Sequence, residues 1–310
     1  MGSVMRRADT VHLGLMLGAL ALAYVLPFEL LLLSYAVLGP AHYFTEISWL
    51  HDRSYFLPHR AFALGLLAVG VGSLLVTDGQ LAGIAIWSAF AGAAILATVK
   101  SPLRAAAIAM FAAAATAIMV LEDTPFVLAA ILLPTFIHVC VFTLLFMTLG
   151  ALKAKSPVQF MLVGVYLAAI VAILIVPPPN RALVPALAEL GRTYFGGVAP
   201  ALGRLVGVPD LQFGGRITGL LSFVYTYHYL NWFIKADVIR WTAIPRPRLA
   251  VIAALSAAST ALYFYNYTIG LAVLLAVSLG HVLLEFPLNG LTIRQLGSAA
   301  LAGRIRHSTA

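Results

Sequence analysis

The chain has 310 residues, of which 62% are hydrophobic and only 10% charged, and its formal net charge at pH 7 is +8. Apolar runs of about 20 residues, long enough to cross a ~30 Å hydrocarbon core as helices, recur along most of the chain. The composition excludes an ordinary soluble domain, and the lack of strand-like alternation argues against an outer-membrane barrel, so we expect an all-α, polytopic transmembrane helical bundle.

About ten spans are predicted in chain order, separated mostly by short polar breaks, at residues 11–26, 28–50, 59–77, 80–99, 102–121, 124–150, 157–177, 215–237, 248–266 and 268–288. No stretch between them is large enough to form a soluble domain with its own core. We therefore expect residues 1–310 to form a single integral membrane domain, a multi-pass protein of the cell (inner) membrane.

The first span also has features of a secretory signal peptide, because Arg6 and Arg7 precede an apolar stretch that contains Ala21-Leu22-Ala23. An uncleaved first helix is favoured, since the residues after Ala23 continue directly into the second apolar run. The one long connection, residues 178–214, alternates apolar and charged residues. We expect it to lie on the extracytoplasmic surface as an amphipathic cap over the bundle, with a substrate-binding lid as the alternative.

The basic residues are distributed unequally between the loops on the two sides of the membrane. With ten spans, the loops on the N-terminal side hold most of the basic residues: Arg6, Arg7, Arg53, Arg60, Lys100, Arg104, Lys153, Lys155, Arg240, Arg246, Arg248, Arg294, Arg304 and Arg306. The opposite side holds Arg181, Arg192, Arg204 and Arg216, all in or beside the long connection. The positive-inside rule then places both termini in the cytoplasm. The basic excess is thus an orientation signal and argues against nucleic acid as a partner.

Four histidines lie near the middle of four of these spans. His42, His138, His228 and His281 follow the starts of their spans, at Phe28, Thr124, Gly215 and Thr268, by 14, 14, 13 and 13 residues. All four spans are even-numbered and run in the same direction, so equal offsets mean equal depth, roughly 20 Å below the outer boundary at ~1.5 Å per residue. Imidazoles in hydrocarbon need partners, so the pattern predicts one shared site.

Two of the histidines are followed by a carboxylate after one helical turn, in His42-x-x-x-Glu46 and His281-x-x-x-Glu285. Spacing of i and i+4 puts both side chains on one helix face, as in metal-binding bundles. The predicted metal ligands are His42, Glu46, His138, His228, His281 and Glu285. Tyr35, Tyr225 and Asn231 are the candidates for catalytic roles through hydrogen bonding or proton transfer.

Cys140 is the single cysteine, so a thiolate-based zinc or iron–sulfur site is excluded. Nitrogen and carboxylate ligands suit iron, zinc, copper or manganese, and open positions favour oxygen chemistry at iron. We expect iron, one ion or two, with another transition metal as the alternative.

Three short windows are similar to motifs of the Brp/Blh family of membrane β-carotene-cleaving oxygenases. They are Gly39-Pro40-Ala41-His42 with Glu46, Phe136-Ile137-His138, and Tyr227-His228-Tyr229. The resemblance implies iron held by histidines from several helices and a carotenoid substrate. Two features depart from the family pattern: Pro40 lies two residues before His42, and no second histidine follows His138 one turn later. His281 and Glu285 are the candidates for that missing role.

These patterns lead to the hypothesis of a membrane-embedded, non-haem iron oxidoreductase of oxygenase, hydroxylase or desaturase type. Its substrate would be a lipid, isoprenoid or carotenoid, and an electron donor would approach from the cytoplasmic side. Two alternatives remain open. Facing histidines also ligate haem in electron-transfer proteins, and intramembrane His and Glu with helix-interrupting prolines also occur in proton- or ion-coupled transporters.

Overall fold

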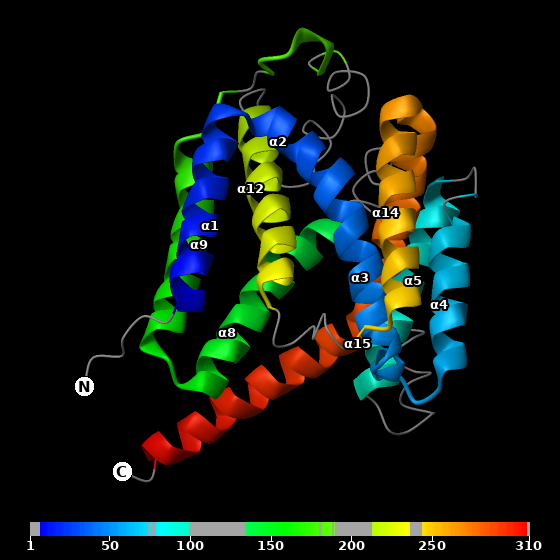
Figure 1. Ribbon diagram of the computed structural model, residues 1–310. Coiled ribbons are helices and arrows are strands. Elements are labelled where there is room, and N and C mark those ends of the chain that lie inside the picture. The colour runs from blue at the N-terminus through cyan, green and yellow to red at the C-terminus, as the bar shows by residue number, and fades with distance from the viewer. Residues whose placement is uncertain are drawn as a thin grey trace.

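The fold is known from a computed structural model, which describes residues 7–73, 75, 79–98, 134–179, 182–187, 189, 213–235 and 244–308. Throughout these residues all regular structure is helical, and they contain no strand, which confirms the all-α expectation. The helices pack as an upright bundle (Figure 1).

The described helices follow the predicted spans. In chain order they are α1 (Arg7–Val25), α2 (Pro27–Leu33), the π-helix η1 (Ser34–Leu38), α3 (Gly39–His51), the 3₁₀-helix η2 (Ser54–Phe56), α4 (Arg60–Ser73), α5 (Gly79–Thr98), the π-helix η3 (His138–Phe142), α8 (Thr143–Ala154), α9 (Pro157–Ile175), α12 (Phe213–Ile234), α14 (Arg246–Tyr265) and α15 (Tyr267–Ser308). Residues 134–137 form a helical turn that leads into η3. Every expected span therefore contains helix except 102–121, which lies outside the described residues.

Five helices are long and apolar enough to cross a membrane: Arg7–Val25, Pro134–Ala154, Pro157–Ile175, Arg246–Tyr265 and Tyr267–Ala300. Shorter apolar helices occupy Arg60–Gly72 and Gly83–Ala93. These lengths and compositions are those of a membrane protein. The count of ten spans and the cytoplasmic placement of the termini stay predictions.

Two apolar cores support the bundle from opposite sides. The first is built by α1, α9 and α12 together with α2 and α3, and includes Met16, Tyr166 and Phe223. The second joins α4, α5 and α15 around Phe90 and Leu283. In Figure 1, α1, α9 and α12 stand on the left and α4 and α5 on the right, with α2 and α3 running diagonally from the first group to the second. The polar residues of interest lie where the two parts meet.

Two spans contain a π-helical turn next to a predicted site residue. The turn η1 directly precedes Gly39-Pro40 in the second span, and η3 begins at His138. Pro40 has no N–H to donate to the preceding turn, and a π turn accommodates this interruption without breaking the helix. Each extra residue also rotates the following side chains by about 100° around the helix axis, which changes the face they present.

The last helix has two parts. At ~1.5 Å per residue, the 42 residues of α15 extend about 63 Å, roughly twice the hydrocarbon thickness, and Pro287 lies inside the helix. Its first part descends beside α14 and is largely buried, whereas its last part bends away and crosses the lower end of the bundle (Figure 1). The start of α1 and the end of α15 lie at this same lower end.

The long connection 178–214 is described only in part. Its first residues make a short turn at 182–187, where the backbone amides of Leu183 and Val184 donate to the Glu29 carboxylate at the top of α2. This attachment fixes the beginning of the connection on the bundle. Its predicted roles as a cap or a lid concern residues that mostly lie outside the described part of the chain.

Candidate metal centre

The four intramembrane histidines meet at one place in the fold. They come from α3, η3, α12 and α15, whose chains all descend in Figure 1. His42, His138 and His281 are at most 1% exposed, and His228 is 8% exposed. Ring centroids lie 4.7 Å apart for His42 and His228 and for His138 and His228, and 5.2 Å apart for His138 and His281. The equal offsets in the sequence thus correspond to direct contact between side chains.

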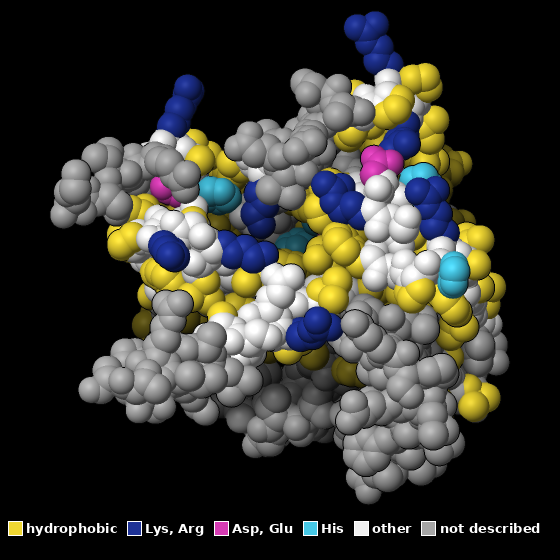
Figure 2. Space-filling model, turned by 90° about the horizontal axis from the view of Figure 1, so that it is seen from below, with side chains coloured by type: hydrophobic (Ala, Val, Ile, Leu, Met, Phe, Trp, Pro, Cys, Tyr) yellow, Lys and Arg dark blue, Asp and Glu magenta, His cyan; other side chains and the backbone are white. Residues whose placement is uncertain are grey.

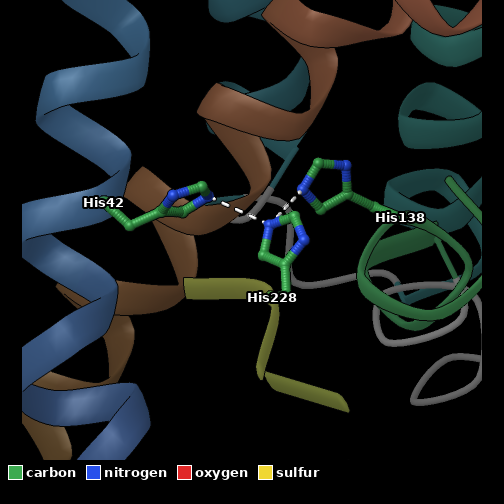
Figure 3. Close-up of side chains that lie close together, drawn as sticks. All are labelled: His42, His138 and His228. Carbon is green, nitrogen blue, oxygen red and sulfur yellow. Dashed lines mark hydrogen bonds between the residues drawn. The ribbon is translucent and has the colours of Figure 1, made fainter. Parts of the chain in front are cut away.

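Three of these histidines point the same nitrogen at one another. The Nε2 atom of His228 lies 3.1 Å from Nε2 of His42 and 3.2 Å from Nε2 of His138 (Figure 3). Metal–nitrogen bonds are about 2.0–2.1 Å long, so neighbouring ligands of one ion lie about 3.0–3.4 Å apart. Each ring nitrogen carries one hydrogen or one lone pair, so a hydrogen bond can account for only one of these two contacts to Nε2 of His228 at a time. The spacing is therefore that of three ligands of one metal ion.

The outer nitrogens of two of these rings are held by neighbouring side chains. The hydroxyl oxygen of Thr143 lies 2.7 Å from Nδ1 of His228, and a carboxylate oxygen of Glu285 lies 2.9 Å from Nδ1 of His138. A partner at Nδ1 fixes the ring orientation and leaves Nε2 as the ligand atom. Glu285, predicted as a ligand, lies beside the outer nitrogen of His138 at ion-pair distance, without regular hydrogen-bond geometry.

Glu46 and His281 complete a second set of donors beside the first. An oxygen of Glu46 lies 3.0 Å from Nε2 of His42, and ligand atoms of His42, Glu46 and His281 all lie within 4.8 Å of one another. The same limit holds for His42, His138 and His228. Each of the two sets could hold a metal ion, and His42 belongs to both.

Aromatic side chains enclose the histidines. The Tyr43 ring stacks on His281 with centroids 4.3 Å apart, and its hydroxyl lies 2.6 Å from the hydroxyl of Tyr229. The indole of Trp232 packs edge-on against His42 at 5.4 Å and donates to the Thr45 hydroxyl. These contacts keep the imidazoles in fixed orientations and limit access of water to them.

The predicted catalytic tyrosines lie one layer further out. Tyr35 contacts Tyr43 and Tyr225 edge-on, at 6.5 and 6.1 Å between ring centroids. The Tyr225 hydroxyl donates to the Thr135 hydroxyl. Both tyrosines thus reach the histidines through Tyr43 and Tyr229, while Asn231 is buried on α12 one turn beyond His228. Their catalytic roles stay predictions.

Four residues that touch the histidines were not predicted from the sequence: Tyr43, Thr143, Tyr229 and Trp232. Tyr43 and Tyr229 are direct sequence neighbours of His42 and His228, so their presence in aromatic-rich runs was a usable signal. Thr143 gave no such signal, because its contact is with His228, on another helix. Only the packing of the π-helical span against α12 reveals it.

The lower face of the molecule carries the basic side chains expected from the charge pattern. Figure 2 shows lysine and arginine side chains spread over this face, around a hollow with a histidine side chain visible inside it. At one edge Arg248 on α14 donates to the Asp52 carboxylate at 2.7 Å, just after the end of α3. That hydrogen bond is the main reason why the pKa of Asp52 lies below its usual value. Lys235, at the lower end of α12, adds positive charge near Glu46 and Glu285.

Comparisons with protein families, with curated proteins and with solved structures found no match to this chain. What the protein can do has to be inferred from its own residues.

Proposed function

We propose that this protein is a membrane-embedded, metal-dependent oxidoreductase that acts on a hydrophobic substrate, with iron as its metal. The observation that carries the proposal is the convergence of the Nε2 atoms of His42, His138 and His228 at 3.1 and 3.2 Å. Three imidazoles with a carboxylate beside them and no thiolate are typical of iron sites that leave positions open for oxygen chemistry. Such a metal, when bound, supplies redox chemistry that no side chain here supplies by itself.

The surroundings favour a substrate that dissolves in the membrane. The donors lie among helices whose outer faces are apolar, so lipids, isoprenoids or carotenoids reach this depth more readily than polar molecules. The motif resemblance around His42, His138 and His228 points to a carotenoid within this class. In this proposal the chain spans the cell membrane ten times with cytoplasmic termini, and an electron donor docks on the basic lower face.

The geometry favours bare metal over haem. The imidazole rings of His42 and His228 contact each other with centroids 4.7 Å apart, as do those of His138 and His228. Two axial ligands of one haem lie on opposite faces of the porphyrin, which requires the macrocycle between them. Rings packed in direct contact leave no room for it.

Elemental analysis of the detergent-purified protein, combined with its absorption spectrum, tests the metal centre. We expect bound iron in the wild type, its loss in His228→Ala, and its retention in His59→Ala, which removes an exposed histidine before α4. A Soret band would favour haem instead. A wild type that binds neither iron nor another transition metal would overturn the proposal.

The reaction itself is tested by oxygen consumption with hydrophobic substrates. Wild type, His228→Ala and His59→Ala are compared in iron-loaded micelles that contain β-carotene, a linear isoprenoid or a fatty-acyl lipid. We expect uptake of oxygen and loss of one substrate with the wild type and His59→Ala only. Metal-independent uptake of a solute into proteoliposomes that His228→Ala abolishes would instead identify a transporter.

A further inference from the structure

The donors near His42 exceed what a single ion can use at this spacing. Two ligands of one ion lie at most about 4.2 Å apart, twice a metal–nitrogen bond of about 2.1 Å. Two sets of donors have ligand atoms that all lie within 4.8 Å of one another: His42, His138 and His228, and His42, Glu46 and His281. The five residues together do not meet this limit. Once Nε2 of His42 serves the first ion, Glu46 and His281 remain as donors at a neighbouring point.

His281 keeps a ring nitrogen that is free to bind a metal. The side chain is 1% exposed, and its nitrogens make no hydrogen bond of regular geometry within the described part of the chain, although the backbone carbonyls of Val277 and Ser278 lie close to the ring. An N–H that donates to these carbonyls occupies one nitrogen and leaves the other as an acceptor. A buried polar group left unsatisfied costs about 1–3 kcal/mol. Stacking on Tyr43 holds the ring in place, with centroids 5.3 Å from His42. A fixed, buried imidazole with one unpaired nitrogen is what a ligand of a second ion requires.

The two carboxylates also meet at this point. Glu46 and Glu285 are 2% and 3% exposed, and their carboxyl groups lie close enough to interact electrostatically. Two buried carboxylates at this distance repel when both are charged, and a cation between them compensates both. Glu46 belongs to the second donor set with His42 and His281, and one oxygen of Glu285 lies 2.9 Å from Nδ1 of His138 at its edge. Carboxylates that bridge two ions in this way are the usual arrangement in helical bundles with paired metals.

We propose that the centre holds two metal ions: a first on the Nε2 atoms of His42, His138 and His228, and a second on His281 and Glu46, beside the carboxylate of Glu285. This inference rests on the proposed function, since it assumes that the first ion binds. It gives Glu46 a bridging position between the ions and makes His281 the one imidazole specific to the second. The two ions then share one enclosed site rather than occupying separate ones.

The test is a titration of chelator-treated, detergent-solubilised full-length protein with Co²⁺, whose d–d absorption reports nitrogen and oxygen ligation. We expect the wild type to saturate at two ions per chain and His281→Ala at one, with the remaining site keeping its affinity. His59→Ala serves as the matched control and should still bind two. A thermal unfolding scan of apo-protein shows whether each variant is folded.

Three outcomes decide the matter. Saturation at two for the wild type, with one lost in His281→Ala, supports the second site. Saturation of the wild type at one ion per chain overturns it and leaves the proposed metal centre standing, with or without an effect of His281→Ala. Failure of the folded wild type to bind any Co²⁺ overturns both proposals, so the two failures are distinguishable. Should His281→Ala not fold, the wild-type stoichiometry alone decides.

Discussion

The neighbouring helices α14 and α15 are both apolar, but α14 is mostly exposed on the surface of the bundle and α15 is mostly buried. In the most apolar 18-residue stretch of α14, 17% of the residues are buried. Val251, Leu255 and Phe264 on this helix are well exposed. In α15 the corresponding share is 56%, and the buried residues include His281, Glu285 and Asn289. One helix turns its apolar side chains outward, as expected against lipid, while the other turns polar ones inward. The buried polar residues, and not hydropathy, therefore distinguish the functional helices from the supporting ones.

The largest effect should come from the inward face of α15. Glu285→Gln removes the negative charge that holds Nδ1 of His138, and loss of such a partner weakens metal binding by about 10–100-fold. Competition of the bound metal against a chelator of known affinity measures the change. Glu29→Gln, at a surface carboxylate of α2, is the control and should leave the affinity unaltered. Equal affinities for Glu285→Gln and wild type would show that the charge of Glu285 does not support metal binding.

A smaller loss should follow from Thr143→Val, which keeps the side-chain shape but removes the oxygen at Nδ1 of His228. We expect a loss of about tenfold in metal affinity, at the lower end of such effects, because the threonine carries no charge. Thr143→Ser retains the hydroxyl and should restore the affinity in the same competition assay. If serine and valine behave alike, the hydrogen bond does not orient the ring.

Alanine substitutions at two glycines compare a tightly packed helix contact with an exposed helix face by their effect on the stability of the protein. A Cβ at Gly270, near the start of α15, would lie 2.2 Å from the Cα of Tyr263 on α14, and backbone cannot move aside easily. We expect Gly270→Ala to destabilise the protein by about 1–3 kcal/mol through overpacking. At Gly164, on the exposed side of α9, a Cβ meets nothing within 4 Å, so alanine should be neutral or stabilise by up to about 1 kcal/mol. Thermal unfolding in detergent compares the two, and equal shifts would contradict the close packing of α14 on α15.

The smallest effect concerns the link between α3 and α14 at the lower face. Arg248 lowers the pKa of Asp52, so the ionised pair stabilises the fold above the unfolded pKa of about 3.9. This contribution is lost as the pH falls through the lower folded pKa, and for a half-exposed pair it is below about 1 kcal/mol. Asp52→Asn should therefore reduce stability slightly at pH 6 and by less at pH 3, which lies below the unfolded pKa. Unfolding curves that differ equally at both pH values would assign the effect to something other than the charge.

Part of this organisation could be read from the sequence. Equal offsets of His42, His138, His228 and His281 from their span starts predicted a common depth, because helical rise converts residue number into distance. The i, i+4 spacing correctly put Glu46 beside His42. It did not predict that Glu285 would contact His138 more closely than its own helix neighbour, since that depends on how α15 packs against η3. Likewise, η1 and η3 rotate the side chains that follow them in a way that apolar periodicity does not encode.

The rings that meet in the cluster are far apart in the chain: His228 is 90 residues from His138 and 186 from His42. No fragment of the protein shorter than the stretch from α3 to α12 contains all three imidazoles. A metal that binds here therefore selects a bundle assembled at least from α3 to α12 over intermediates that are inserted less far. By mass action, free metal at 100 times its dissociation constant would stabilise that assembled state by about 2.7 kcal/mol. Metal supply during membrane insertion is then expected to set how much of the newly made chain reaches its final packing.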